Sequence, residues 1–260
     1  ALVLTVGLAF GIPALSRPAV NTEELVIFSQ RAGEAVKAAP KAAASLPEGS
    51  ITLNNSGCEP QYRSIWAGSD SGTFPLIGVE GRYYRMLNNP TSIDDTLLGA
   101  SLGTVSEFTT EPALSSGEVL LSNKAEQGTD VYAINSMDGT LVAAKVDGVY
   151  RVFQRVGFSG NAVKGAEMLA DTLQVRGHVQ AVELSGVGTV TDQDTAESLV
   201  DTLLDNASYE SSGSITGKQS LLIQLDNGLT VQMTVKDDKV SACGTWSCPE
   251  FIEAFAAAAE

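Results

Sequence analysis

Hydrophobic and polar positions alternate in short runs from about residue 50 onward, and turn residues separate these runs. The clearest series consists of the segments 131–134, 140–146 and 149–154. Asp138-Gly139 and Asp147-Gly148 stand between them, and such pairs favour the tight turns of β-hairpins. The pattern therefore predicts a three-stranded antiparallel meander.

The second half of the chain has a similar arrangement. Runs at 221–225 and 229–235 flank Asn227-Gly228, and a polar turn at 236–239 follows. In both halves the glycine of the first turn precedes the last valine of the next run by seven residues. This spacing indicates an internal duplication. A chance match between common hairpin signals is the alternative.

Further strands are expected upstream of each series. A hairpin is predicted in which Glu80-Gly81 joins 77–79 to 82–87, and short strands are predicted at 51–53 and 178–184. All of these runs are rich in residues that favour strands.

Helices are predicted where apolar positions recur every three to four residues. Three such segments are Ala162–Leu173, Thr195–Leu204 and Pro249–Phe255, the last with proline in the first turn, where it is tolerated. A shorter helix is predicted over Ser92–Leu98, capped by its own serine and ended by the following glycine. Together the elements predict an α+β fold, mostly antiparallel, with two related helix-plus-β-meander units at 50–157 and 158–260.

The segment 1–16 carries no charged residue. It is shorter than the roughly 20 residues of a membrane-spanning helix. A signal-peptide remnant and a trimmed membrane anchor both fit it, with a buried core segment as the alternative. Residues 32–49 are rich in Ala and Pro and poor in large apolar side chains, so 17–49 is predicted to be a linker or stalk. This layout is typical of an exported protein, so we expect an extracytoplasmic location, membrane-anchored or secreted.

Composition narrows the classes of partner. The chain has 260 residues, with 31 acidic and 16 basic side chains and a formal net charge of -15. This charge argues against nucleic acid and against anionic lipid surfaces, since both need clustered Lys and Arg. A single histidine excludes metal sites built from several histidines. We expect no cofactor and no metal, and contact with the membrane only through the N-terminal segment.

The three cysteines leave several interpretations open. Cys243 and Cys248 enclose four residues, and a disulfide between them is a candidate if their Cα atoms come within bonding range. Free structural thiols are the main alternative, and a redox or metal role is a third. Cys58 is left over.

Several motifs have the residue types of active sites. Gly186–Thr191 begins like a dinucleotide-binding loop but lacks the third glycine, and Gly213–Lys218 resembles a phosphate loop that is one residue short. Both are expected to be plain loops. His178 is the one residue on which a Ser-His-Asp triad could be built, and its place in a predicted strand favours a structural role.

Two groups of side chains remain as candidates. The acidic pairs Asp94-Asp95, Asp192/Asp194 and Asp237-Asp238 stand at predicted helix starts and turns, where capping accounts for them. Aromatic residues either line a binding face or pair across strands in the core. They are Trp66, Tyr83, Tyr84, Tyr132, Tyr150, Phe153 and Trp246.

A series of glycine and apolar patterns points to one group of proteins. It consists of Gly-Arg-Tyr-Tyr at 81–84, Leu-Gly-Ala-Ser-Leu-Gly-Thr-Val at 98–105, Gly-Thr-Asp-Val-Tyr-Ala-Ile at 128–134 and Ala-Lys-Val-Asp-Gly-Val-Tyr-Arg at 144–151. Over about 78–155 the chain resembles uncharacterised extracytoplasmic domains of membrane-anchored proteins from Gram-positive bacteria. It departs from their pattern at Ser101-Leu102. The resemblance implies export and an anchored sensor or surface role, and it transfers no functional residue.

These observations lead to an expected function. We expect a non-catalytic extracytoplasmic sensory or protein-interaction module whose partner is another envelope or membrane protein. The alternatives are a carboxylate-dependent hydrolase and a small-ligand carrier of the cell envelope. Converging acids with a shifted pKa in a pocket would favour the hydrolase, and an exposed aromatic face would favour the interaction module.

Overall fold

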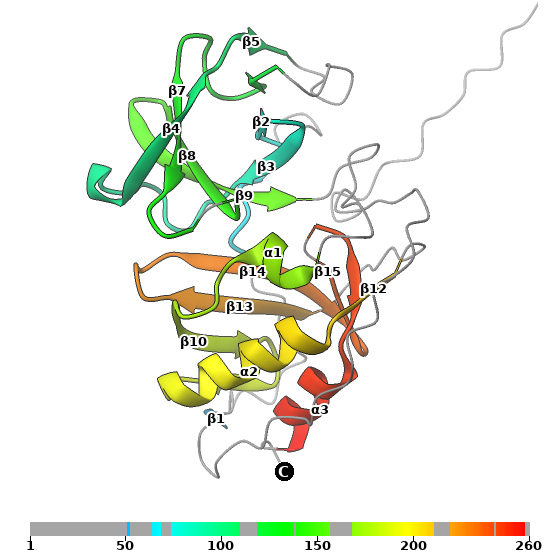
Figure 1. The fold of residues 1–260 in the computed structure, drawn as a ribbon. Helices are drawn as coiled ribbons and strands as arrows, with labels where there is room; N and C mark the ends of the chain where they lie inside the picture. The colour runs from blue at the N-terminus through cyan, green and yellow to red at the C-terminus, as the bar shows by residue number, and fades with distance from the viewer. Residues whose placement is uncertain are drawn as a thin grey trace, which may run out of the picture.

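Two stacked β-sheets form the framework of the described part of the chain (Figure 1). The computed structural model describes residues 51–52, 64–68, 74–109, 119–137, 139–156, 168–210, 219–241 and 243–257. Strands account for 47% of these residues. The described helices are short: α1 (Leu169–Leu173), α2 (Gln193–Asn206) and α3 (Pro249–Ala257). The fold is mostly β, so the predicted α+β class is wrong.

The first sheet has the strand order β4-β7-β8-β9-β3-β2-β6-β5. Its neighbours are antiparallel, except for the parallel pair β5 and β6. The strands are β2 (Leu76–Val79), β3 (Arg82–Met86), β4 (Leu98–Thr104), β5 (Glu107–Phe108), β6 (Leu121–Ser122), β7 (Asp130–Ile134), β8 (Leu141–Val146) and β9 (Val149–Val156). The predicted hairpin around Glu80-Gly81 and the predicted meander are confirmed as β2–β3 and β7–β8–β9.

The second sheet has the order β1-β11-β10-β13-β14-β15-β16-β12, and all its pairs are antiparallel. Its strands are β1 (Ile51–Thr52), β10 (Val179–Leu184), β11 (Gly188–Val190), β12 (Ser208–Glu210), β13 (Gln219–Leu225), β14 (Thr230–Lys236), β15 (Lys239–Ser241) and β16 (Thr245–Ser247). The predicted strands at 178–184, 221–225 and 229–235 are confirmed within one or two residues.

One bent stretch of chain nearly closes the first sheet on itself. β4 and β5 lie at opposite edges of the sheet, although only two residues separate them in the chain. The N–H of Val105 donates to the carbonyl of Thr129 at 2.8 Å, beside β7, and the N–H of Ser106 donates to the carbonyl of Leu120 at 2.9 Å, beside β6. The stretch 98–108 therefore crosses from one edge to the other. A bend of this kind lets a strand form the corner of a curved sheet.

The outer strand β4 contains two irregularities in its pairing with β7. Leu98 pairs with Ile134, and Ser101 pairs with Tyr132. Between these two pairs the chain advances by three residues in β4 but by only two in β7. Between Ser101 and Gly103 two residues of β4 match one of β7. Each irregularity is a β-bulge, which bends the strand and increases its local twist.

The meander is buried on both faces because successive residues of a strand point to opposite sides. Val142, Phe153 and Val131 point into the core of the first sheet. Leu141 and Val152 point the other way and belong to one cluster with residues of the second sheet and the helices. The two sheets therefore share a core. A strand covered on both sides has a continuous apolar run, as 141–144 does.

Polar contacts reinforce this junction. The backbone N–H of Ile65 donates to Oε1 of Gln232 on β14 at 2.7 Å, and both residues are buried. The hydroxyl of Thr140 donates to the carbonyl of Leu173 at the end of α1. These bonds satisfy polar groups that the junction removes from water.

The longer helices cover the opposite face of the second sheet (Figure 1). α2 packs on β10 and on α3, and it buries Leu199 and Leu203. The predicted helices at 195–204 and 249–255 are confirmed. α1 begins at Leu169, and 162–167 of the third predicted helix lie outside the described residues. No helix within the described ranges has the length and apolar character needed to cross a membrane. The predicted N-terminal segment and stalk, 1–16 and 17–49, also lie outside these ranges.

Two local predictions are wrong. In place of a helix over Ser92–Leu98 there is a single turn of 3-10 helix at Asp95–Leu97, capped by Asp94 rather than Ser92. It ends because the backbone of Leu98 already pairs with β7. The two halves are also not related helix-plus-β-meander units. The described part of the first half has no α-helix before its meander. In the first sheet, β9 is hydrogen bonded next to β3, which comes earlier in the chain, whereas in the second sheet β15 is hydrogen bonded next to β16, which comes later.

Candidate functional site

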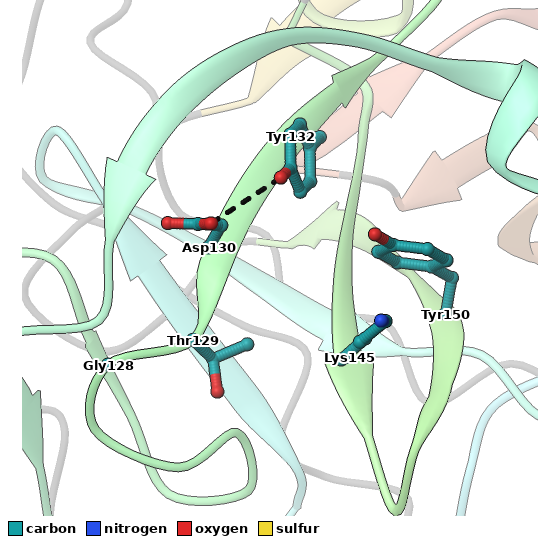
Figure 2. A pocket seen from close by; sticks show the side chains of 6 residues that line it. All are labelled: Gly128, Thr129, Asp130, Tyr132, Lys145 and Tyr150. Carbon is teal, nitrogen blue, oxygen red and sulfur yellow. Dashed lines mark hydrogen bonds between the residues drawn. The ribbon is translucent and has the colours of Figure 1, made fainter.

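A surface pocket of about 300 Å³ lies at one end of the meander (Figure 2). Side chains from β7, β8 and β9 and the loop before β7 surround it. Its lining residues are Gly128, Thr129, Asp130, Tyr132, Lys145 and Tyr150.

The position of this pocket follows from the shared core. Tyr132 pairs across the sheet with Ala143, so its side chain lies on the face that packs on the second sheet. Lys145 and Tyr150 pair with each other, further along the same face. At this end Lys145 is exposed and the two tyrosines are partly exposed, so the polar and aromatic side chains reach solvent. The meander thus carries an apolar patch and a pocket on one continuous face.

Two tyrosines form the aromatic wall of the pocket. The rings of Tyr132 and Tyr150 meet edge to face, with centroids 6.1 Å apart and an angle of 82° between their planes. Such a pair has a defined geometry and is favourable beyond the area it buries. Desolvation and the nearby carboxylate of Asp130 raise the pKa of Tyr132 above its usual value, so its phenol remains protonated at neutral pH.

Lys145 supplies a positive charge. Its Nζ lies 5.0 Å from the centroid of the Tyr150 ring, within the range of a cation–π interaction. Among the residues that the structure describes, no carboxylate lies within salt-bridge distance of this ammonium. The charge is therefore held on an aromatic surface and is not neutralised by an acid.

Asp130 supplies a negative charge on the neighbouring strand. Its carboxylate accepts hydrogen bonds from the hydroxyl of Thr104 at 2.8 Å and from the hydroxyl of Tyr132 at 3.5 Å. Two bonds leave part of its accepting capacity unused, since an ionised carboxylate has about four lone-pair sites. The side chain is thus oriented and still able to accept from a ligand.

A second, smaller hollow of about 170 Å³ adjoins the pocket. Thr129 and Lys145 line both, so Lys145 stands between them. Lys124, Glu126 and Asp147 bring further charges of both signs to the smaller hollow. The surrounding surface is therefore charged and hydrated.

The structure divides the predicted aromatic candidates into three groups. Tyr132 and Tyr150 line the pocket, as the binding-face alternative predicted. Trp66 is partly buried, and its ring lies 5.1 Å from the guanidinium of Arg85. The remaining candidates are buried in the core, and they are Tyr83, Tyr84, Phe153 and Trp246.

Lys145, Asp130 and Thr129 were not predicted as site residues from the sequence. Lys145 is the one polar residue in the apolar run of β8, which is the signal that could have identified it. Asp130 carried a weaker signal, because it looks like an ordinary strand-start residue until the pairing with β4 is known.

The acidic pairs act in local structure. The carboxylate of Asp192 accepts from the N–H of Thr195 at 3.0 Å and from its hydroxyl, and Asp94 accepts from the N–H of Thr96 at 2.9 Å. These hydrogen bonds lower the pKa of both carboxyls. Asp237 lies in a turn with φ of 55°. In the described part of the chain no three His, Cys, Asp or Glu side chains are grouped to hold a metal ion.

The remaining motifs also have structural explanations. Nδ1 of His178 lies 3.1 Å from Oδ2 of Asp226, a surface pair at the start of β10. Gly186–Thr191 contains β11, which pairs with β10, so the segment is a hairpin and not a phosphate-binding loop. Gly213–Lys218 lies outside the described residues.

Cys243 and Cys248 are both buried, with the extended strand β16 between them. Burial raises the pKa of Cys248 to about 12, and the negative charges of Asp238 and Glu250 add to this effect. The disulfide between them and the free-thiol alternative both stay predictions, and Cys58 lies outside the described residues.

Known proteins offer no match to this chain. No family model fits it, and no curated protein or solved structure is significantly similar to it. The resemblance to extracytoplasmic domains of Gram-positive bacteria therefore stays a prediction.

Proposed function

We propose that this chain is a non-catalytic extracytoplasmic sensory module that recognises its ligand in the pocket between Tyr132 and Tyr150. One observation carries the proposal: the ammonium of Lys145 lies over an aromatic ring in an open pocket, without a carboxylate partner in the described structure. In a chain with net charge -15, acids are abundant, so an unneutralised cation beside exposed rings favours a binding role.

The chemistry of the pocket favours binding over hydrolysis. Carboxylate-dependent hydrolysis needs two acids close together, one of which has a raised pKa. This pocket contains one carboxylate, that of Asp130. Among the described acids, the clear pKa shifts are downward, at Asp94 and Asp192, which cap helices elsewhere. Paired aromatic rings and a single lysine supply affinity and orientation instead.

The extracytoplasmic location and the partner rest on the sequence. The uncharged segment 1–16 and the Ala/Pro-rich stretch that follows are typical of an exported and anchored chain. A sensory module on the outer face passes its state to another protein, so we propose an envelope or membrane protein as the partner.

Affinity capture tests this function. The full chain is immobilised and exposed to envelope and membrane extracts of the source cell, and retained proteins and small molecules are identified by mass spectrometry. Tyr150→Ala removes the aromatic wall, while Lys236→Gln changes an exposed lysine on β14, remote in sequence and on the other sheet. Circular dichroism confirms that both variants are folded.

We expect the same ligand or partner to be retained by the wild-type chain and by Lys236→Gln, and to be lost with Tyr150→Ala. Equal retention by Tyr150→Ala would place recognition elsewhere on the molecule. If the wild-type chain retains neither a protein nor a small molecule specifically, the sensory function is wrong.

A further inference from the structure

Asp130 and Lys145 occupy neighbouring positions on adjacent strands. Val131 pairs with Ala144 in the antiparallel register of β7 and β8, so the next position places Asp130 opposite Lys145. Directly opposite residues lie on the same face, with their Cβ atoms about 5 Å apart. Opposite charges at such positions normally attract each other across the strands.

The two side chains instead turn away from each other. Asp130 points toward Thr104 on β4 and Tyr132 on its own strand, to which it is hydrogen bonded. Lys145 points toward Tyr150 on β9. Figure 2 shows the carboxylate and the ammonium well separated on either side of the pocket. The space between two cross-strand charges is therefore open and accessible.

We propose that an α-amino acid binds in this space, with its ammonium on Asp130 and its carboxylate on Lys145. This inference rests on the proposed function and assigns the ligand class of the same pocket. In an α-amino acid the ammonium and the carboxylate groups are attached to the same carbon, and this short separation suits two protein charges on neighbouring strands. The termini of a peptide lie much further apart, so a peptide meets one of the two charges only.

The rest of the pocket suits such a ligand. The rings of Tyr132 and Tyr150 offer apolar contact to its side chain, and the hydroxyl of Thr129 offers a further hydrogen bond. A volume of about 300 Å³ is at the lower end of ordinary ligand pockets, which favours a single small molecule.

The overall charge of the chain separates this ligand from a simple anion. A net charge of -15 repels a free anion such as phosphate or acetate from the surface. A zwitterion has no net charge and is not repelled. The carboxylate of Asp130 also disfavours an anion, whereas it attracts the ammonium of an amino acid.

Calorimetry with matched probes tests the inference on the full chain. The probes are L-phenylalanine and L-alanine, each compared with its N-acetyl derivative, which keeps only the carboxylate, and with its amide, which keeps only the ammonium. We expect at least one of the two free amino acids to bind at least tenfold more tightly than either of its derivatives.

Variants assign each charge to its partner. Asp130→Asn is expected to weaken binding of the amino acid and its amide about tenfold and not to weaken binding of the N-acetyl form. Lys145→Gln is expected to weaken binding of the amino acid and the N-acetyl form and not to weaken binding of the amide. Asp237→Asn and Lys236→Gln are the matched controls, since both residues are exposed and lie in the other sheet or its turn. Neither control is expected to change binding.

The outcomes separate the two proposals. If neither amino acid binds saturably, or if the derivatives bind as tightly as the zwitterions, the amino-acid inference is wrong. In that case, ligand capture that still depends on Tyr150 leaves the sensory function intact. If that capture also fails, both proposals are wrong.

Discussion

The side-chain amide of Gln154 pairs with the backbone of Gln232 as a neighbouring strand would. The N–H of Gln232 donates to Oε1 of Gln154 at 2.9 Å, and Nε2 of Gln154 donates to the carbonyl of Gln232 at 2.8 Å. β14 lacks a strand on this side, because its pairing with β15 begins only at Thr234. A single glutamine of the first sheet thus satisfies both backbone groups of a buried residue in the second.

Replacing this glutamine should be costly. In Gln154→Ala, two buried backbone groups of Gln232 lose their partners, and each such loss costs about 1–3 kcal/mol. We expect the free energy of unfolding to fall by about 3 kcal/mol, measured by urea denaturation. The control is Gln180→Ala at an exposed position of β10, which should change stability by less than about 0.5 kcal/mol. An equal effect of the two substitutions would contradict the role of the paired amide.

The shared core predicts that both sheets unfold together. Ile65, Leu141 and Val152 of the first half are buried in one cluster with β10, β13 and α2. The two tryptophans report on each half, since Trp66 adjoins β3 and Trp246 lies in β16. In Trp66→Phe and in Trp246→Phe, the fluorescence of the remaining tryptophan should change at the urea concentration at which the whole chain unfolds. Separate transitions would support independent domains at 50–157 and 158–260.

Helix α2 should depend on pH through its N-cap. The folded-state pKa of Asp192 is lowered, chiefly by the hydroxyl and N–H of Thr195. Its contribution is therefore fully present above the unfolded-state pKa near 3.8 and is lost as pH falls through the lower folded-state value. Asp192→Asn keeps a capping acceptor but cannot titrate. Thermal unfolding between pH 5 and about pH 2 should show a smaller loss of melting temperature for Asp192→Asn than for the wild type.

Replacing Gly148 in the turn beside the pocket should destabilise the chain. Asp147 and Gly148 both have positive φ, 53° and 84°, as a two-residue hairpin turn with the twist of its strands requires. A Cβ on Gly148 would meet nothing within 4 Å, so the cost of Gly148→Ala is backbone strain alone, about 1 kcal/mol. Gly68→Ala is the control, because its Cβ also meets nothing and its φ is not in that region. The two changes should differ in urea denaturation by about the cost of the strain.

The thiols should be unreactive in the folded chain. Burial holds the pKa of Cys248 near 12, so almost none of it is thiolate at neutral pH. In Cys58→Ser, a thiol reagent without reductant should find two thiols after denaturation and react slowly before it. A count of zero after denaturation would establish the disulfide between Cys243 and Cys248 instead.

Local signals in the sequence predicted the strands well and the architecture poorly. Asp147-Gly148 and Asn227-Gly228 mark turns through their own backbone preferences, so the hairpins could be recognised directly. The α+β class failed because strands make up 47% of the described residues and the described helices are short. The segment 92–98 was predicted to be a helix, but Leu98 at its end pairs with Ile134 in the first sheet. Such a pairing joins residues far apart in the chain and leaves no local pattern.

Only the two tyrosines of the pocket were among the residues predicted from the sequence, for the same reason. Tyr132 and Tyr150 stood among seven aromatic candidates that no local pattern distinguishes. What distinguishes them is that they line a pocket at one end of the meander, and that depends on tertiary packing. Lys145 and Asp130 became candidates only when the register of β7 and β8 placed them opposite each other.

The two bulges of β4 have a consequence for the protein at high concentration. An exposed edge strand offers unpaired backbone groups to the edge of another molecule, and regular strands of this kind assemble into fibres. β4 has seven residues and contains no charged residue and no proline. A flat edge strand of this kind would pair readily with the edge of another molecule. Its bulges interrupt the spacing of the free N–H and carbonyl groups, so two copies find no common register. The irregular edge therefore disfavours edge-to-edge pairing between molecules.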